Sequence, residues 1–150
     1  MRRVGIALAG IAAALLLSSC GTTVETLYSW GGYQNGTTAY ENLAYLSYDK
    51  QSPQSICGLV AVYENMVSHP GGSRRVPPPG ICAEYGYLLL QPGTAETFTQ
   101  NASSSQKSLF GSSDYAVLFR EKGQEMLEKE VEYYPESARF IEPLIKKLAK

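Results

Sequence analysis

Apolar side chains recur at helical spacing along most of the chain after Thr38, and proline or glycine separates one such stretch from the next. Thr38 and Glu41 have the spacing of a capping box, in which a hydroxyl and a carboxylate each satisfy a backbone N–H at a helix start. Ser52 precedes Pro53, the pattern of an N-cap before a first-turn proline. The three stripes that follow are Tyr40, Leu43, Ala44, Ser47 and Tyr48; Ile56, Leu59, Val60, Tyr63, Met66 and Val67; and Ile81, Cys82, Tyr85, Leu88 and Leu89. Three helices joined by short turns predict antiparallel hairpins.

Two more helices are predicted towards the C-terminus. Asp114 can cap a fourth helix that runs to about residue 134. A fifth starts at Pro135-Glu136-Ser137 and has one apolar face, which consists of Phe140, Ile141, Leu144, Ile145 and Leu148. Pro143 removes one helical hydrogen bond there, which predicts a kink or a late helix start.

The remaining stretches have no helical period. Residues 94–113 are mostly polar, which predicts a mobile loop inserted between the third and fourth helices. The segment from Leu27 to Gln34 is irregular, and we expect its aromatic side chains to pack against the first hairpin as a lid. Strand signals are weak, although Asn35-Gly36 can turn the chain. We therefore predict an all-α fold with an irregular N-terminal aromatic segment and a polar inserted loop.

The composition fits one folded domain and excludes several classes of function. The chain has 150 residues, of which 44% are hydrophobic and 18% charged, so there is enough apolar material for one core. With 13 Lys and Arg against 14 Asp and Glu, it lacks the basic footprint of a nucleic-acid-binding protein. One His and distant thiols have no metal-ligand spacing, so we expect neither a metal nor a cofactor.

The first 19 residues have the form of an export signal. Arg2 and Arg3 precede an apolar run from Val4 to Leu17, which is shorter than the roughly 20 residues of a membrane-spanning helix. The run ends in Leu17-Ser18-Ser19-Cys20, which resembles the bacterial lipobox. The resemblance implies removal of residues 1–19, attachment of diacylglycerol to the Cys20 thiol and acylation of the new amino terminus.

The expected mature protein is a lipid-anchored domain. Residues 20–26 would form a short tether and residues 27–150 a single helical domain. Removal of Arg2 and Arg3 leaves 11 basic against 14 acidic side chains, a charge of about −3. Gly21 follows the lipidated cysteine, where lipoproteins kept in the inner membrane have aspartate, so the pattern favours the outer membrane, facing the periplasm.

Export also leaves two cysteines, Cys57 and Cys82, in an oxidising compartment, where an even number is typical of a disulfide. Closing a loop of roughly 25 residues would stabilise the fold by about 3 kcal/mol. The alternative is that both are small buried hydrophobic residues that do not meet.

Three stretches carry a family resemblance. Leu27–Tyr33 reads LYSWGGY, Pro78–Leu88 reads PPGICAEYGYL and Tyr134–Ser137 reads YPES. In this order they resemble the LYxWGxY, PPGxxAExGYL and PES blocks of the DUF4810 family of bacterial lipoproteins. The resemblance implies a tetratricopeptide-repeat-like fold. It also implies a place beside other envelope lipoproteins, one of them of the curli-secretion-channel (CsgG) type.

The resemblance makes a specific prediction about packing. The AExGYL block would be the first helix of a hairpin, in which Gly86 lets the second helix approach closely. A proline usually closes such a unit about 24 positions later, whereas Pro135 lies 49 positions after Gly86. Roughly 25 residues are therefore inserted, and the stretch from Asp114 to Lys122 is expected to form an additional helix or a continuation of the fourth.

Two functions fit these features, and neither is enzymatic. The first is a non-catalytic scaffold or accessory subunit of a multi-lipoprotein complex, with Trp30 and Tyr33 as the best contact residues, since aromatic residues are favoured at interfaces. Arg74 and Arg75 are candidates for an acidic partner or a lipid head group. The second is a periplasmic module that binds a peptide or small ligand in a helical groove. Cys57, Cys82 and His69 lack the context of a thiol active site, so we expect no enzyme.

Overall fold

The computed structural model describes residues 25–148. The predicted signal peptide (residues 1–19) and the lipidation site Cys20 lie outside these residues, as does most of the expected tether. Within the described range, no helix is both long and apolar enough to cross a membrane.

The described residues are predominantly helical, so the predicted all-α class is confirmed. The helices are α2 (Ala39–Lys50), α3 (Pro53–Ser68), α4 (Ile81–Leu90), α5 (Thr94–Asn101), α6 (Ser104–Lys107), α7 (Tyr115–Tyr133) and α8 (Ala138–Leu148). Two short antiparallel strands, β1 (Tyr33–Gln34) and β2 (Thr37–Thr38), precede them. A single 3-10 turn, η1 (Pro135–Ser137), separates α7 from α8.

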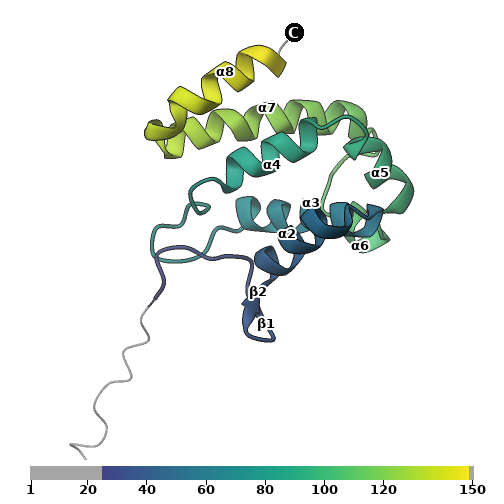
Figure 1. The fold of residues 1–150 in the computed structure, drawn as a ribbon, viewed down its shortest axis with the longest axis horizontal. Helices are drawn as coiled ribbons and strands as arrows, with labels where there is room; N and C mark the ends of the chain where they lie inside the picture. The colour runs from purple at the N-terminus through teal and green to yellow at the C-terminus, as the bar shows by residue number, and fades with distance from the viewer. Residues whose placement is uncertain (1–24, 149–150) are drawn as a thin grey trace, which may run out of the picture.

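The helices form layers on either side of α4 (Figure 1). The hairpin of α2 and α3 lies against one side of α4 through α3, and α7 packs along the other side. Helix α8 lies on the outer side of α7, and α5 and α6 close one end of the molecule. Helix α4, which contains the stretch AEYGYL (residues 83–88), is therefore the central element.

Three of the helix starts predicted from the sequence, at Thr38, Ser52 and Asp114, are confirmed. The Thr38 hydroxyl accepts from the Glu41 N–H at 3.1 Å, and the Glu41 carboxylate accepts from the Thr38 N–H at 3.0 Å, which completes the capping box of α2. The Ser52 hydroxyl accepts from the Ser55 N–H at 3.2 Å at the start of α3. Asp114 caps α7 through the Val117 N–H at 3.2 Å.

Helix α4 obtains its N-terminal cap from another helix. Its own N-cap residue is Gly80, which has no side chain to offer. Glu130 of α7 supplies the acceptors instead: Oε1 accepts from the Gly80 N–H at 2.8 Å and Oε2 from the Ala83 N–H at 3.3 Å. Burial of Glu130 raises the pKa of its carboxyl group, and the backbone hydrogen bonds oppose that rise.

The predicted close approach at Gly86 is confirmed. A Cβ added to Gly86 would lie 2.7 Å from the carbonyl oxygen of Gly123 on α7, well inside van der Waals contact. Gly123 is equally crowded, because its added Cβ would lie 2.6 Å from Cγ of Leu90. Helices α4 and α7 therefore meet through two glycines. The stretch from Asp114 to Lys122 continues the fourth helix, since α7 runs unbroken from Tyr115 to Tyr133.

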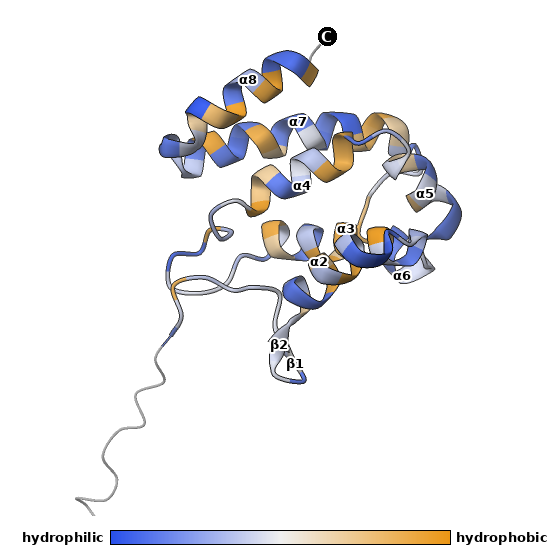
Figure 2. Cartoon of the chain, in the orientation of Figure 1, coloured by the Kyte–Doolittle hydropathy of each residue, from blue (hydrophilic) through white to orange (hydrophobic). Residues whose placement is uncertain are grey.

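The prediction of a loop over residues 94–113 is wrong. This stretch contains α5 and α6, and the side chain of Phe98 is fully buried. Phe98 packs against Phe110, Tyr115 and Phe119, with ring centroids 5.0–5.4 Å apart. The buried face consists of Thr94, Phe98 and Ala102, which are spaced at i, i+4 and i+8. Most residues between them are polar, so the helical period is difficult to recognise in the sequence. In Figure 2, α5 and α6 are accordingly mostly blue and white.

The predicted disulfide is not formed. Cys57 on α3 and Cys82 on α4 are both free and buried, which is the alternative stated for them above. The Cys57 thiol points to the carbonyl oxygen of Thr97 on α5, at 3.8 Å. The number of cysteines indicated a pair, but it carried no information about whether their side chains face each other.

The start predicted for the last helix is partly wrong. Helix α8 begins at Ala138 and passes through Pro143, so the proline does not delay the helix start. Pro135 to Ser137 form the separate 3-10 turn before it. The lysines Lys146 and Lys147 occupy the last turn of α8, where the helix dipole favours positive charge.

Candidate functional site

The N-terminal segment is fixed to the connection between α3 and α4. The carbonyl oxygens of Thr26 and Leu27 accept from the N–H groups of Ser73 at 3.0 Å and Arg74 at 3.2 Å. Gly72 makes this approach possible, because its φ is +78° and an added Cβ would lie 2.5 Å from the Leu27 oxygen. The segment is therefore held in place before it reaches the first helix.

Arg74 contacts the N-terminal segment of the same chain. Its guanidinium donates to the Tyr28 hydroxyl at 3.1 Å and lies 5.9 Å from the centre of the Tyr28 ring. Tyr28 in turn packs near Tyr134, whose hydroxyl donates to the Pro77 carbonyl at 2.6 Å. Both arginines predicted to meet a partner are exposed, and Arg74 also helps to hold the N-terminal segment in place.

Four aromatic rings run from the surface into the core. Trp30 stacks on Tyr40 of α2, Tyr40 on Tyr63 of α3 and Tyr63 on Tyr85 of α4, with centroid distances of 5.5, 5.9 and 5.6 Å. Such tilted pairs are favourable beyond the area that they bury. Tyr63 and Tyr85 are buried core residues, as their helical spacing predicts, whereas Trp30 remains partly exposed. The predicted lid is thus attached to the core through Trp30.

A carboxylate accepts hydrogen bonds at each end of the tyrosine series. Near the surface, Glu84 of α4 accepts through Oε2 from the hydroxyls of Tyr40 at 2.8 Å and Tyr63 at 2.6 Å. In the core, Glu64 of α3 accepts through Oε2 from the Tyr85 hydroxyl at 2.7 Å. Burial, followed by the neighbouring carboxylate, raises the pKa of Tyr40 and Tyr63. These hydroxyls therefore stay protonated and act as donors.

The inner carboxylate is neutralised by a lysine from α7. Oε1 of Glu64 accepts from Nζ of Lys122 at 2.8 Å and from the Ser68 hydroxyl at 2.7 Å. The Glu64 side chain is 7% exposed and that of Lys122 is 22% exposed, so water screens this pair only partly. The ion pair joins α3 to α7 across the central helix.

We expect Lys122→Met to lower the free energy of unfolding by about 2 kcal/mol, because it leaves the Glu64 carboxylate buried without its cation. Lys129→Met is the matched control. Lys129 pairs with Glu125 at 2.7 Å, but both side chains are exposed, so a loss of at most about 0.5 kcal/mol is expected. Urea denaturation followed by circular dichroism measures both. Equal losses for the two variants would contradict this account.

The outer end of the series is an exposed face rich in tyrosine. We call it the aromatic face and define it by Trp30, Tyr33, Tyr40, Tyr48, Glu41, Glu84 and Tyr87, which come from the N-terminal segment, β1, α2 and α4. The buried Tyr63 of α3 contributes to the lining of its groove. One hollow of about 500 Å³ is lined by Trp30, Tyr33, Thr38, Tyr40 and Glu41. A groove of about 170 Å³ includes Tyr48, Glu84 and Tyr87, and the hydrogen bond from the Tyr40 hydroxyl to Glu84 links the two linings.

The structure brings together only part of the predicted site. Trp30 and Tyr33 share the first hollow of the aromatic face, whereas Arg74 packs on Tyr28 and does not line that hollow. The sequence analysis missed Glu84 and Tyr87. Their i, i+3 spacing on α4 is a signal that could have found them, because both face away from the buried stripe of that helix.

Residues 25–148 contain no group of three or more His, Cys, Asp or Glu side chains placed to hold a metal ion. Burial raises the pKa of the Cys57 thiol, and burial together with the nearby Glu130 raises that of Cys82 to about 12. Both cysteines are therefore neutral thiols near pH 7 and poor nucleophiles. The chain matches no protein-family model, no curated protein and no solved structure.

Proposed function

We propose that the protein is a lipid-anchored lipoprotein of the bacterial outer membrane, facing the periplasm, that acts as a non-catalytic scaffold or accessory subunit of a multi-lipoprotein complex. The observation that carries the proposal is the aromatic face, which includes the N-terminal segment itself. Trp30 lies only ten residues after the predicted lipidation site Cys20. A contact surface so close to the anchor favours partners at the same membrane.

The chemistry of the face supports protein contact. Tyrosine and tryptophan bury a large area at low entropic cost and keep a polar tip for hydrogen bonding. Tyr33 and Tyr48 are each 80% exposed, and Trp30 is held against Tyr40 without being covered. The Trp30 ring is therefore positioned before a partner arrives, which lowers the ordering cost of binding.

The family resemblance suggests which partners to look for. We propose that the chain is a DUF4810 lipoprotein with a tetratricopeptide-repeat-like core, in which α4 and α7 form the hairpin and the segment with α5 and α6 is the insertion. The close glycine contact of α4 and α7 and the PES turn after α7 support this assignment. On this basis a lipoprotein of the CsgG type is the first candidate partner.

The test is affinity purification from detergent-solubilised membranes with the full chain. Trp30→Ala should lower recovery of the co-purified lipoprotein at least tenfold while leaving helical content unchanged, because the indole is partly exposed and not in the core. Phe140→Ala is the control, since Phe140 is an exposed aromatic residue on α8, outside the aromatic face. Unchanged recovery with Trp30→Ala would count against the proposed contact surface.

A companion variant tests the anchor. Cys20→Ser should abolish incorporation of labelled palmitate into the protein, because it removes the thiol that would carry diacylglycerol. Mass spectrometry of the wild-type amino terminus provides the matched observation. Palmitate incorporation into Cys20→Ser at the wild-type level, or an unacylated wild-type amino terminus, would rule out lipid attachment at Cys20.

A second candidate function is capture of a periplasmic peptide or small ligand. The hollow of about 500 Å³ beside Trp30 favours it, since its volume is typical of ligand sites. Native mass spectrometry of the purified protein separates the two functions. A bound small molecule without a protein partner supports capture, and a stoichiometric lipoprotein partner supports the scaffold.

A further inference from the structure

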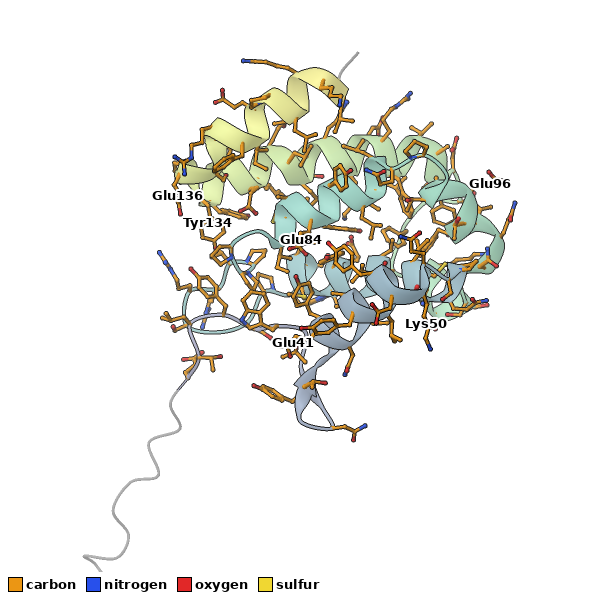
Figure 3. All side chains as sticks on the ribbon, viewed as in Figure 1. Glu41, Lys50, Glu84, Glu96, Tyr134 and Glu136 are labelled. Atoms are coloured by element: carbon orange, nitrogen blue, oxygen red, sulfur yellow. The ribbon has the colours of Figure 1, made fainter. Side chains whose placement is uncertain are left out.

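The groove between α2 and α4 combines aromatic rings with a carboxylate. Its lining includes Tyr48 of α2, Leu59 and Tyr63 of α3, and Glu84, Tyr87 and Leu88 of α4. Its volume, about 170 Å³, suits a single side chain and not a large ligand. Figure 3 shows Glu84 on the side of α4 that faces α2 and α3. The groove is therefore open to solvent and has the Glu84 carboxylate on one side.

The Glu84 carboxylate has unused capacity to accept. Both hydrogen bonds to it, from Tyr40 and Tyr63, reach the same oxygen, Oε2. A carboxylate offers about four acceptor sites, so Oε1 can accept from a further donor. The glutamate is exposed, and it is held in one orientation by two hydroxyl donors from two other helices.

No cation of residues 25–148 neutralises Glu84. The ion pairs in this part of the chain join Lys122 to Glu64 and Lys129 to Glu125. No Lys or Arg lines this groove or the hollow beside Trp30, where Glu41 adds a second carboxylate. Trp30, with Tyr33 and Tyr40, continues the aromatic surface there. The aromatic face therefore presents π systems and negative charge together.

The arginines of the described chain are engaged or placed elsewhere. Arg74 lies on Tyr28, and Arg75 is exposed in the connection between α3 and α4, outside the lining of the groove. Arg139 lies 4.5 Å from the centre of the Phe140 ring, and Arg120 lines a separate pocket with Leu89 and Leu148. The groove is thus complementary to a cation that must come from another molecule.

We propose that this groove binds the arginine side chain of a partner protein, with the guanidinium donating to Glu84 and lying against the rings of Tyr48 and Tyr87. Arginine suits the site better than lysine, because a planar guanidinium can donate two parallel hydrogen bonds to a carboxylate and can stack on aromatic rings. The inference rests on the proposed function, and it specifies the partner: a segment with an exposed arginine.

The test is a titration of the full chain in detergent with the peptide acetyl-Gly-Arg-Gly-amide, followed by NMR of ¹³C-labelled tyrosine rings. We expect shifts of the Tyr48 and Tyr87 signals and a dissociation constant on the order of 1 mM, typical of one small anchoring group. The control peptide carries citrulline in place of arginine, which keeps the shape and removes the charge. It should bind at least tenfold more weakly, and equal binding of the two peptides would overturn the proposal.

Matched variants locate the site. Glu84→Gln keeps an acceptor for the two tyrosines but removes the charge, and it should weaken arginine binding at least tenfold. Glu128→Gln makes the same change at an exposed position of α7 and should have no effect. Tyr48→Leu should weaken binding several-fold. Tyr45→Leu is its control, since Tyr45 is on the same helix, 72% exposed against 80%, and does not line the groove. Equal effects of a variant and its control would overturn the assignment.

The same variants separate this inference from the proposed function. If Glu84→Gln leaves partner recovery intact while Trp30→Ala abolishes it, the scaffold stands and the arginine site is wrong. If the peptide binds as expected but no lipoprotein co-purifies with the wild-type chain, the site stands and the scaffold is wrong. Circular dichroism of each variant confirms that its helices are intact.

Discussion

Glu130→Ala should lower the free energy of unfolding by about 3 kcal/mol, one of the two largest effects expected in this protein. Glu130 is buried, and its carboxylate accepts from the backbone of Gly80 and Ala83 at the start of α4. Removing it leaves buried N–H groups without an acceptor, at about 1–3 kcal/mol in total, and adds a cavity next to them. The loss exceeds that of an ordinary surface cap because the capped helix is the central one.

Urea denaturation followed by circular dichroism measures this loss, and Glu128→Ala is the matched control. Glu128 lies two residues earlier on α7, is exposed, and should change stability by at most about 0.5 kcal/mol. Glu130→Gln should fall between the two, because the amide retains one acceptor oxygen. If Glu130→Ala is no worse than its control, the cross-helix cap does not stabilise the fold.

The second large effect is expected from Gly86→Ala, which should destabilise the fold by about 3 kcal/mol. In an exposed helix interior the same substitution stabilises, since alanine is favoured over glycine by up to about 1 kcal/mol. At this position the new methyl group would lie 2.7 Å from the backbone oxygen of Gly123, which cannot move without shifting α7. The sign of the effect is therefore reversed by packing.

Gly58→Ala on α3 is the matched control for this prediction. Its added Cβ would lie 3.0 Å from Cδ2 of Leu43, the end of a flexible side chain that can rotate away. We expect a change within about 1 kcal/mol, in either direction. Thermal melts of both variants at one protein concentration give the comparison. Similar midpoints would show that α4 and α7 are not locked together at Gly86.

The parts of the fold predicted correctly depend on residues near one another in sequence. The capping box of Thr38 and Glu41 and the N-cap at Ser52 need only three-residue spacing, so the sequence is enough to predict them. The close approach at Gly86 was predicted from a resemblance of residues 78–88 to a known sequence block. Helix α5 was missed because its buried face is only Thr94, Phe98 and Ala102, a shorter apolar pattern than the others.

The features that sequence analysis missed depend on tertiary contacts. Glu130 lies on a helix with many acidic residues, where one more glutamate is typical of a solvated face, although it is buried against α4. Glu84 became notable only when Tyr40 and Tyr63 were seen to donate to it from two other helices. The possible disulfide between Cys57 and Cys82 was suggested incorrectly for the same reason, since the number of cysteines gives no distance between their side chains.

If Cys20 carries the proposed lipid, the hydrogen bond from the Ser73 N–H to the Thr26 carbonyl limits how far the domain can stand from a membrane. Six residues, 20–25, precede Thr26 from the predicted lipidation site onwards, and six residues span at most about 20 Å at full extension. An acylated chain would therefore diffuse laterally with its domain in the layer just above the lipid head groups. Encounters with another anchored protein would then occur in two dimensions at high effective concentration, so even a weak contact at Trp30 or Glu84 could sustain an assembly.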